Sequence, residues 1–205
     1  MQRTELTPEE GWRTIHRTMA QSYSSLYLAG TGYILLLWGA LVSVYFFALF
    51  AIAELAPGFE ANYPWYPGPL WVIIGTPGMI GSALIGHWEG SRNADHSTAR
   101  SAGLRVFAFW MAVVAAAFLV SGTAGLWSED GAEKIPHVTI GIISLGYVLF
   151  GIMHLPALVV VGIGMAAAFY IPDYFAGDFA ALGTGAGMLA VTLFGAAWIH
   201  KSGQA

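Results

Sequence analysis

The side chains best suited to chemistry in this chain are two histidines, His87 and His154, each at the end of an apolar stretch. Two imidazoles on facing membrane helices can ligate a haem iron or another metal ion. Neither histidine belongs to a Cys or His spacing that is typical of a metal site, and interfacial polar residues are common at such positions. We therefore predict no cofactor and keep haem b, bound by this pair, as the alternative.

The rest of the sequence offers little material for catalysis. It contains no cysteine, which excludes disulfides, thiolate metal sites and cysteine nucleophiles. The glycine-rich segment at 183–187 superficially resembles a phosphate-binding loop, but it lies in an apolar stretch with no preceding strand and no lysine. Since no nucleophile and base can be paired, we predict that the protein is not an enzyme.

Composition indicates a membrane protein. Of the 205 residues, 57% are hydrophobic and only 10% are charged, against roughly 25% charged in soluble domains. We therefore predict an all-α, polytopic helical bundle whose main partner is the lipid bilayer. A net charge of -4 with eight basic residues argues against a nucleic-acid partner.

Hydropathy along the chain predicts six transmembrane helices. Each needs about 20 apolar residues to cross the hydrocarbon. The predicted spans are residues 27–55, 70–87, 104–127, 137–153, 156–171 and 179–199, followed by a tail at 200–205.

An amphipathic helix is predicted before the first span, at residues 1–26. Thr7-Pro8-Glu9-Glu10 is typical of a helix start. An apolar stripe follows it at helical spacing: Trp12, Ile15, Met19, Tyr23 and Leu26. This helix is expected to lie in the membrane interface as an anchor, with partner docking as the alternative.

The apolar run from His137 to Ile171 is longer than one span requires. It is interrupted at Met153-His154-Leu155-Pro156, and proline is well tolerated as the first residue of a new helix. We predict two short spans joined by a tight turn, against the alternative of one kinked and tilted helix.

The distribution of basic residues supports six spans and orients them. With six spans, one side carries seven of the eight Lys and Arg residues: Arg3, Arg13, Arg17, Arg92, Arg100, Arg105 and Lys201. Lys134 is alone on the other side, whereas five spans would move Lys201 across to join it. By the positive-inside rule both termini are predicted to be cytoplasmic.

Small residues mark candidate helix-packing faces, because they let helix backbones approach closely in lipid. They are Gly75, Gly78, Gly81, Ser82 and Gly86 in the second span and the GxxxG pair Gly183 and Gly187 in the last. The GxxxG pair is expected to pack either within the protein or in a homodimer.

The predicted outer face is acidic and aromatic. Its candidate residues are Glu54, Trp65, Asp173 and Asp178. The loop that contains Trp65 is predicted to form an aromatic interface belt, with closure of a ligand mouth as the alternative. Ionisable residues are missing from the middle of every predicted span, which argues against a proton relay or an ion pump.

Several motifs together resemble a known group of proteins. They are Leu37-Trp38-Gly39, Arg105 followed by Phe109-Trp110, Gly146-Tyr147-Val148-Leu149-Phe150-Gly151, Gly162, Tyr174-Phe175 and the glycines at 183, 185 and 187. In this order they are similar to a loose family of uncharacterised six-span bacterial inner-membrane proteins, often encoded near small winged-helix regulators. The resemblance implies a bacterial inner-membrane location and carries no activity.

We expect a non-catalytic membrane protein that acts through helix packing and contacts with a protein partner or a second copy, as a sensor or accessory subunit. A small transporter or channel is the first alternative, and a haem- or quinone-binding subunit the second. A transporter would need a polar path built from hydroxyl residues: Thr31, Ser43, Thr76, Ser82, Ser121, Thr123, Thr139, Ser144, Thr184 and Thr192. Such hydroxyls more often bond to their own helix backbone.

Overall fold

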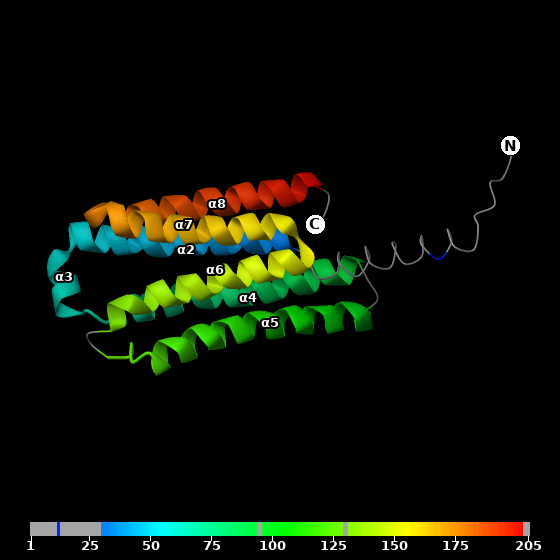
Figure 1. Ribbon diagram of the computed structural model, residues 1–205, viewed down its shortest axis with the longest axis horizontal. Helices are drawn as coiled ribbons and strands as arrows, with labels where there is room; N and C mark the ends of the chain where they lie inside the picture. The colour runs from blue at the N-terminus through cyan, green and yellow to red at the C-terminus, as the bar shows by residue number, and fades with distance from the viewer. Residues whose placement is uncertain (1–11, 13–29, 94–95, 129–130, 203–205) are drawn as a thin grey trace.

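The computed structural model describes residues 12, 30–93, 96–128 and 131–202 (Figure 1). Every regular element in these residues is helical. In chain order they are α2 (Thr31–Leu55), α3 (Pro57–Asn62), α4 (Pro67–Asn93), α5 (His96–Thr123), η1 (Ala132–Lys134), α6 (Ile135–His154), α7 (Pro156–Phe175), η2 (Gly177–Phe179) and α8 (Ala180–Ser202). Apart from Trp12, the amphipathic helix predicted at 1–26 lies outside the described residues.

Six of these helices are long and apolar enough to cross a membrane: α2, α4, α5, α6, α7 and α8. This count confirms the expected six-helix bundle and indicates a multi-pass integral membrane protein. The break between the fourth and fifth spans falls at Leu155, whose backbone is extended (φ -153°, ψ 104°). A residue before proline disfavours the helical conformation, so α6 ends at His154 and Pro156 begins α7.

Helix bounds differ from the predicted spans mainly around α4 and α5. The second span was predicted to end at His87 and the third to begin at Leu104, yet α4 continues to Asn93 and α5 begins at His96. Hydropathy marks the edge of the hydrocarbon, whereas polar residues extend a helix beyond it. At its other end α5 stops at Thr123, because Gly125 adopts a positive φ of 72° that ends the helix.

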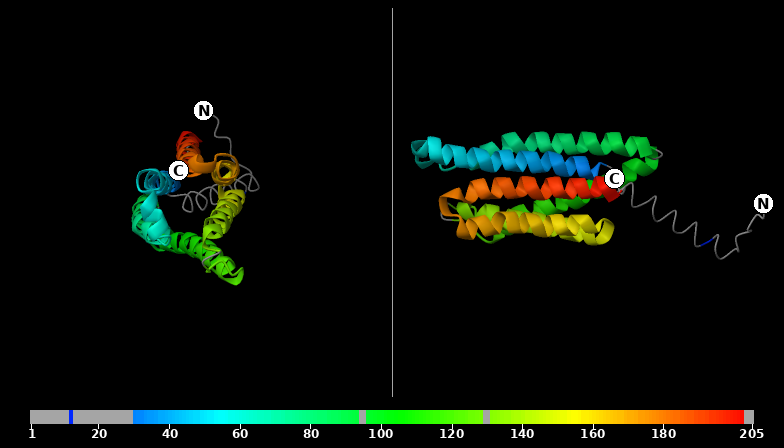
Figure 2. Two further views of the ribbon diagram at one scale, coloured as in Figure 1. Left: turned by 90° about the vertical axis from the view of Figure 1, so that its left-hand side faces the viewer. Right: turned by 90° about the horizontal axis from the view of Figure 1, so that it is seen from above.

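The six long helices form a closed ring in the order α2, α4, α5, α6, α7, α8 and back to α2. The end-on view in Figure 2 shows this ring, and Figure 1 shows α3 lying across one end of it. That end also carries Glu54, Asp173 and Asp178 and is named the acidic end. The opposite end carries Arg92, Arg100 and Lys201 and is named the basic end.

Close backbone approach at glycines joins α2 to α8. Gly39 lies directly under the Thr192 side chain, so that any Cβ at this position would overlap it. One end of the same seam brings Gly32 against the His200 ring, with 3.0 Å between the ring Nε2 and an ideal Cβ. Since apolar side chains gain nothing by leaving lipid for another helix, such close contacts are what hold membrane helices together.

Glycines also allow close backbone approach between α6 and α7, which form a hairpin. A Cβ at Gly151 would lie 2.5 Å from the backbone nitrogen of Val159, and one at Gly162 would lie 2.6 Å from the carbonyl oxygen of Ser144. These glycines set the register of the hairpin from its turn to its middle. The two helices therefore approach as closely as their backbones allow.

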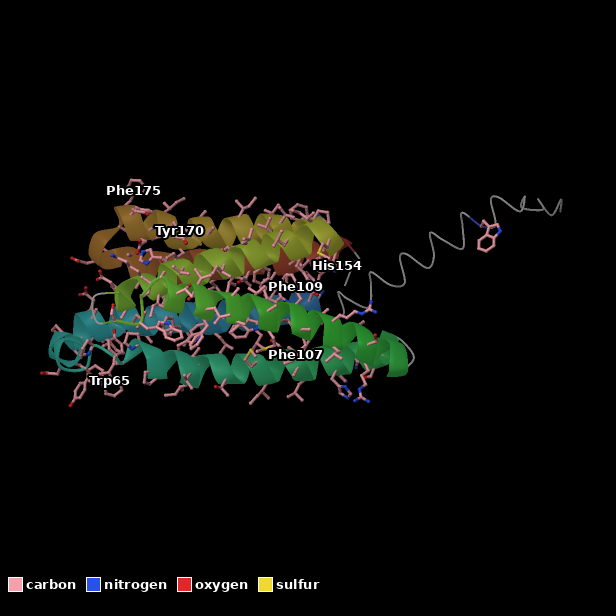
Figure 3. The ribbon with its side chains drawn as sticks, turned by 60° about the horizontal axis from the view of Figure 1, so that its bottom comes forward. Trp65, Phe107, Phe109, His154, Tyr170 and Phe175 are labelled. Carbon is pink, nitrogen blue, oxygen red and sulfur yellow. The ribbon has the colours of Figure 1, made fainter. Side chains whose placement is uncertain are left out.

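Packing around the ring is uneven. Buried residues make up 28–33% of the most apolar stretch of α2, α7 and α8, but only 11% in α4 and 6% in α5. Figure 3 labels two residues of α5, of which Phe107 is exposed while Phe109 packs its ring 5.3 Å from that of Phe150 on α6. The helix α5 is therefore the least covered member of the bundle.

Candidate functional site

The strongest candidate site is a cluster at the acidic end, between the start of α6 and the end of α7. It consists of His137, Asp173 and Tyr170. His137 and Asp173 each lie 18 residues along the chain from Leu155, the turn of the hairpin. Two antiparallel helices of equal length from a tight turn bring such residues level with each other. The hairpin register therefore places the imidazole opposite the carboxylate.

The imidazole and the carboxylate are in direct contact. His137 Nε2 lies 2.8 Å from Asp173 Oδ2. The His137 and Asp173 side chains are 36% and 31% exposed. An ionised carboxylate accepts hydrogen bonds and cannot donate them, so this contact with an ionised Asp173 requires the proton on Nε2. The other ring nitrogen, Nδ1, is buried and has no hydrogen-bond partner among the described residues.

Tyr170 joins the same two helices through a second hydrogen bond. Its hydroxyl donates to the backbone carbonyl oxygen of His137 across 2.6 Å. Gly141, one turn further along α6, leaves room for this hydroxyl, because a Cβ there would lie only 2.8 Å from it. The backbone carbonyl of His137, at the start of α6, is thus hydrogen-bonded to the Tyr170 side chain of α7. This side chain fits because residue 141 is a glycine.

Ring contacts lead from this cluster into the bundle. The His137 ring meets the Phe169 ring edge to face, with centroids 5.3 Å apart. From there successive rings lie 5.2–6.3 Å apart across α7, α2 and α4, in the order Phe169, Phe46, Tyr45, Trp71 and Trp38. The chain ends where Trp38 Nε1 donates to Ser82 Oγ across 2.9 Å. An aromatic row therefore connects the acidic-end cluster with a polar contact between α2 and α4.

The cluster joins two helices through side-chain polar groups. An imidazole and a carboxylate connect α6 to α7 directly, and a phenol hydroxyl adds a second link to the backbone. Among the described residues, no three His, Cys, Asp or Glu side chains are grouped so that they could hold a metal ion. The geometry found at the acidic end is thus that of a polar contact between two helices.

The two histidines of the haem alternative lie elsewhere. His87 is exposed on α4. His154, the last residue of α6, packs its ring 4.7 Å from that of Phe150 and lies at the opposite end of α6–α7 from Tyr170 (Figure 3). α5 separates α4 from α6 in the ring, so the pair is not on neighbouring helices.

The predicted packing residues of α4 divide by the direction they face. Gly78 lies against Trp38 and Leu41 of α2, and Gly81 lies against Leu37. Ser82 accepts the hydrogen bond from Trp38. By contrast, the nearest neighbour of Gly75 is Trp71 of its own helix, and a Cβ at Gly86 would meet none of the described atoms within 4 Å.

The GxxxG pair of α8 faces α7 within the same chain. Gly183 lies against Pro172, and a Cβ at Gly187 would lie 2.8 Å from the Cβ of Ala168. Between them Gly185 faces the other way, toward Phe47 of α2. Packing inside the bundle accounts for the pair.

Of the four residues predicted on the outer face, only Asp173 has a hydrogen-bond or ion-pair partner among the described residues. Glu54 and Asp178 are exposed, and Trp65 is 65% exposed with its ring 6.1 Å from that of Tyr63. From the sequence, His137 was assigned no functional role. Its equal spacing with Asp173 from the Leu155 turn was the signal that could have found the pair.

Comparison of the chain with protein-family models, with curated proteins and with solved structures found no match. Function is therefore inferred from the geometry of the chain itself.

We expect Tyr170→Phe to weaken the acidic end of the α6–α7 hairpin, because it removes the hydrogen bond to the His137 carbonyl. The free energy of unfolding in mixed detergent micelles should fall by about 0.5–1.5 kcal/mol, the usual net value of one such bond. Tyr174→Phe is the matched control, since Tyr174 lies one turn further along α7 and is 74% exposed. Equal losses in both variants would contradict the assignment.

Proposed function

We propose that the protein is a non-catalytic component of the bacterial inner membrane that acts through helix packing and contacts with a membrane partner, as a sensor or accessory subunit. The observation that carries this proposal is the unequal cover of the ring. Glycines pack α2, α8, α7 and α6 closely together, whereas only 6% of the most apolar stretch of α5 is buried. A subunit that works by contact needs a rigid body and an open helix surface.

The exposed surface of α5 has a composition suited to another helix. Ala108, Ala112 and Ala115 follow one another at helical spacing and are all exposed. Small side chains let a second helix approach closely, which gains contact energy that lipid chains alone do not provide. We therefore assign the partner contact to this face of α5, named the alanine face.

The hydroxyl groups support this reading over a transporter. Thr76 and Thr123 are exposed and bond to carbonyls of their own helices. Ser121 and Thr192 are buried and do the same. Hydroxyls satisfied in this way, on several faces of the ring, act as helix-compatible packing residues. Ser43 and Ser144 have buried hydroxyls without a described partner.

Substitution on the alanine face tests the proposal. Ala112→Trp should abolish copurification of the protein with its membrane partner, or its self-association, after mild detergent extraction. Leu193→Trp is the control, because Leu193 is half exposed on α8, away from α5. Retention of the complex by both variants, or a lone monomer in the unsubstituted protein, would contradict the proposal.

Orientation follows from the proposal that the acidic end faces away from the cytoplasm. The absence of native cysteine makes single-cysteine labelling clean, and the two lysines provide a matched pair. In intact cells, Lys134→Cys should react with a membrane-impermeant thiol reagent, and Lys201→Cys should react only after the membrane is opened. The reverse pattern would show that the positive-inside rule misplaces this chain.

A further inference from the structure

We propose that the His137–Asp173 pair is a proton-binding switch: it closes the acidic end of the α6–α7 hairpin near neutral pH and releases it on acidification. The inference deepens the proposed sensor function and rests on it, because it supplies the trigger of that sensor. The ligand is the proton, and the site is the imidazole of His137.

The argument begins with the two nitrogens of the ring. Near neutral pH, Nε2–H donates to the Asp173 carboxylate and the buried Nδ1 holds only a lone pair. When the ring takes up a proton, Nδ1 becomes a second N–H donor in a place where the described residues offer no acceptor. A buried donor without an acceptor is costly. The present ring position is therefore suited to neutral histidine and unsuited to the charged form.

The proposal takes this cost to exceed the gain in charge attraction, because both side chains of the pair are about a third exposed and water screens their charges. The charged ring lowers its energy by turning Nδ1–H toward water. Protonation of Asp173 instead of His137 has the same direction, because it removes the charge that strengthens the Nε2–H hydrogen bond. Each route weakens the contact between α6 and α7.

The groups around the ring leave His137 as the sensing residue. Asp173 and Tyr170 face it from α7, with Tyr174 one turn beyond them. On its own side of the hairpin, Glu133 and Lys134 of η1 precede it and are exposed, and Asp178 of η2 is also exposed. Histidine is the residue type in this set that ordinarily changes charge between about pH 5 and 8.

Movement of the ring has consequences beyond the hairpin. The edge-to-face contact with Phe169 must break when the imidazole turns outward. Phe169 in turn contacts Phe46 of α2, from which the aromatic row continues to Trp71 of α4. A proton at the acidic end thus alters the aromatic packing that connects α7 with α2 and α4.

Distance measurement between spin labels tests the switch in the full chain, reconstituted in lipid nanodiscs. The absence of native cysteine permits Ala132→Cys and Phe175→Cys as a labelled pair across the acidic end, both at exposed positions. Met153→Cys and Val160→Cys, exposed at the other end of the same hairpin, form the control pair. From pH 8 to pH 5 the acidic-end distance should lengthen and broaden, while the control distance stays constant.

Substitutions then identify the sensing group. His137→Gln keeps an N–H donor for Asp173 but cannot change charge, so the acidic-end distance should no longer depend on pH. His87→Gln removes an exposed histidine elsewhere and should leave the response intact. Should His137→Gln fail to fold, Asp173→Asn serves instead: loss of the carboxylate charge weakens the hydrogen bond that closes the hairpin, so the acidic end should open at a higher pH than in the parent protein.

A constant acidic-end distance in the parent protein, or an unchanged response in His137→Gln, would overturn the switch. Either result leaves the alanine-face experiment on α5 unaffected. Failure of the trigger and failure of the partner contact can therefore be told apart.

Discussion

Close approach of helix backbones is the constraint on which this structure depends. In lipid, apolar side chains gain nothing by leaving hydrocarbon for a neighbouring helix, so contact must come from fit. Glycine supplies the fit at Gly39 under Thr192, at Gly151 against Val159 and at Gly162 against the Ser144 carbonyl. With Gly187 of α8 against Ala168 of α7, these seams join α2, α8, α7 and α6 into a continuous body. α4 and α5 complete the ring with far less of their surface covered.

The acidic-end cluster is a product of that packing. Gly151 and Gly162 hold the hairpin in one register, and in that register His137 meets Asp173 while Tyr170 reaches the first turn of α6 past Gly141. A shift of one turn along the seam would separate all three. The chemistry proposed for the site is correspondingly simple. An imidazole and a carboxylate can bind a proton without help from any further group.

Much of the fold could be read from the sequence, because hydropathy and the positions of Lys and Arg report directly on the bilayer. Six spans and the break before Pro156 follow from these signals. The ends of the helices cannot be predicted from these signals, because α5 begins at His96, in a polar segment for which hydropathy predicts a loop. The candidate site was harder to predict than the fold. His87 and His154 were considered together because they lie at the same end of their spans, but the sequence of each span does not show which helices are neighbours in the ring. Gly78 and Gly86 were both predicted to lie on a helix-packing face of the second span, but of the two only Gly78 faces α2.

A double-mutant cycle at Gly39 tests the dependence on close packing most directly. Gly39→Ala should lower the free energy of unfolding in mixed micelles by about 1–3 kcal/mol, the usual cost of overpacking. Gly86→Ala should be neutral or stabilising, because alanine favours a helix where there is space. Adding Thr192→Gly to Gly39→Ala should recover part of the loss by moving the small residue to the other helix. If Gly39→Ala were as well tolerated as Gly86→Ala, glycine packing would not be what holds this bundle together.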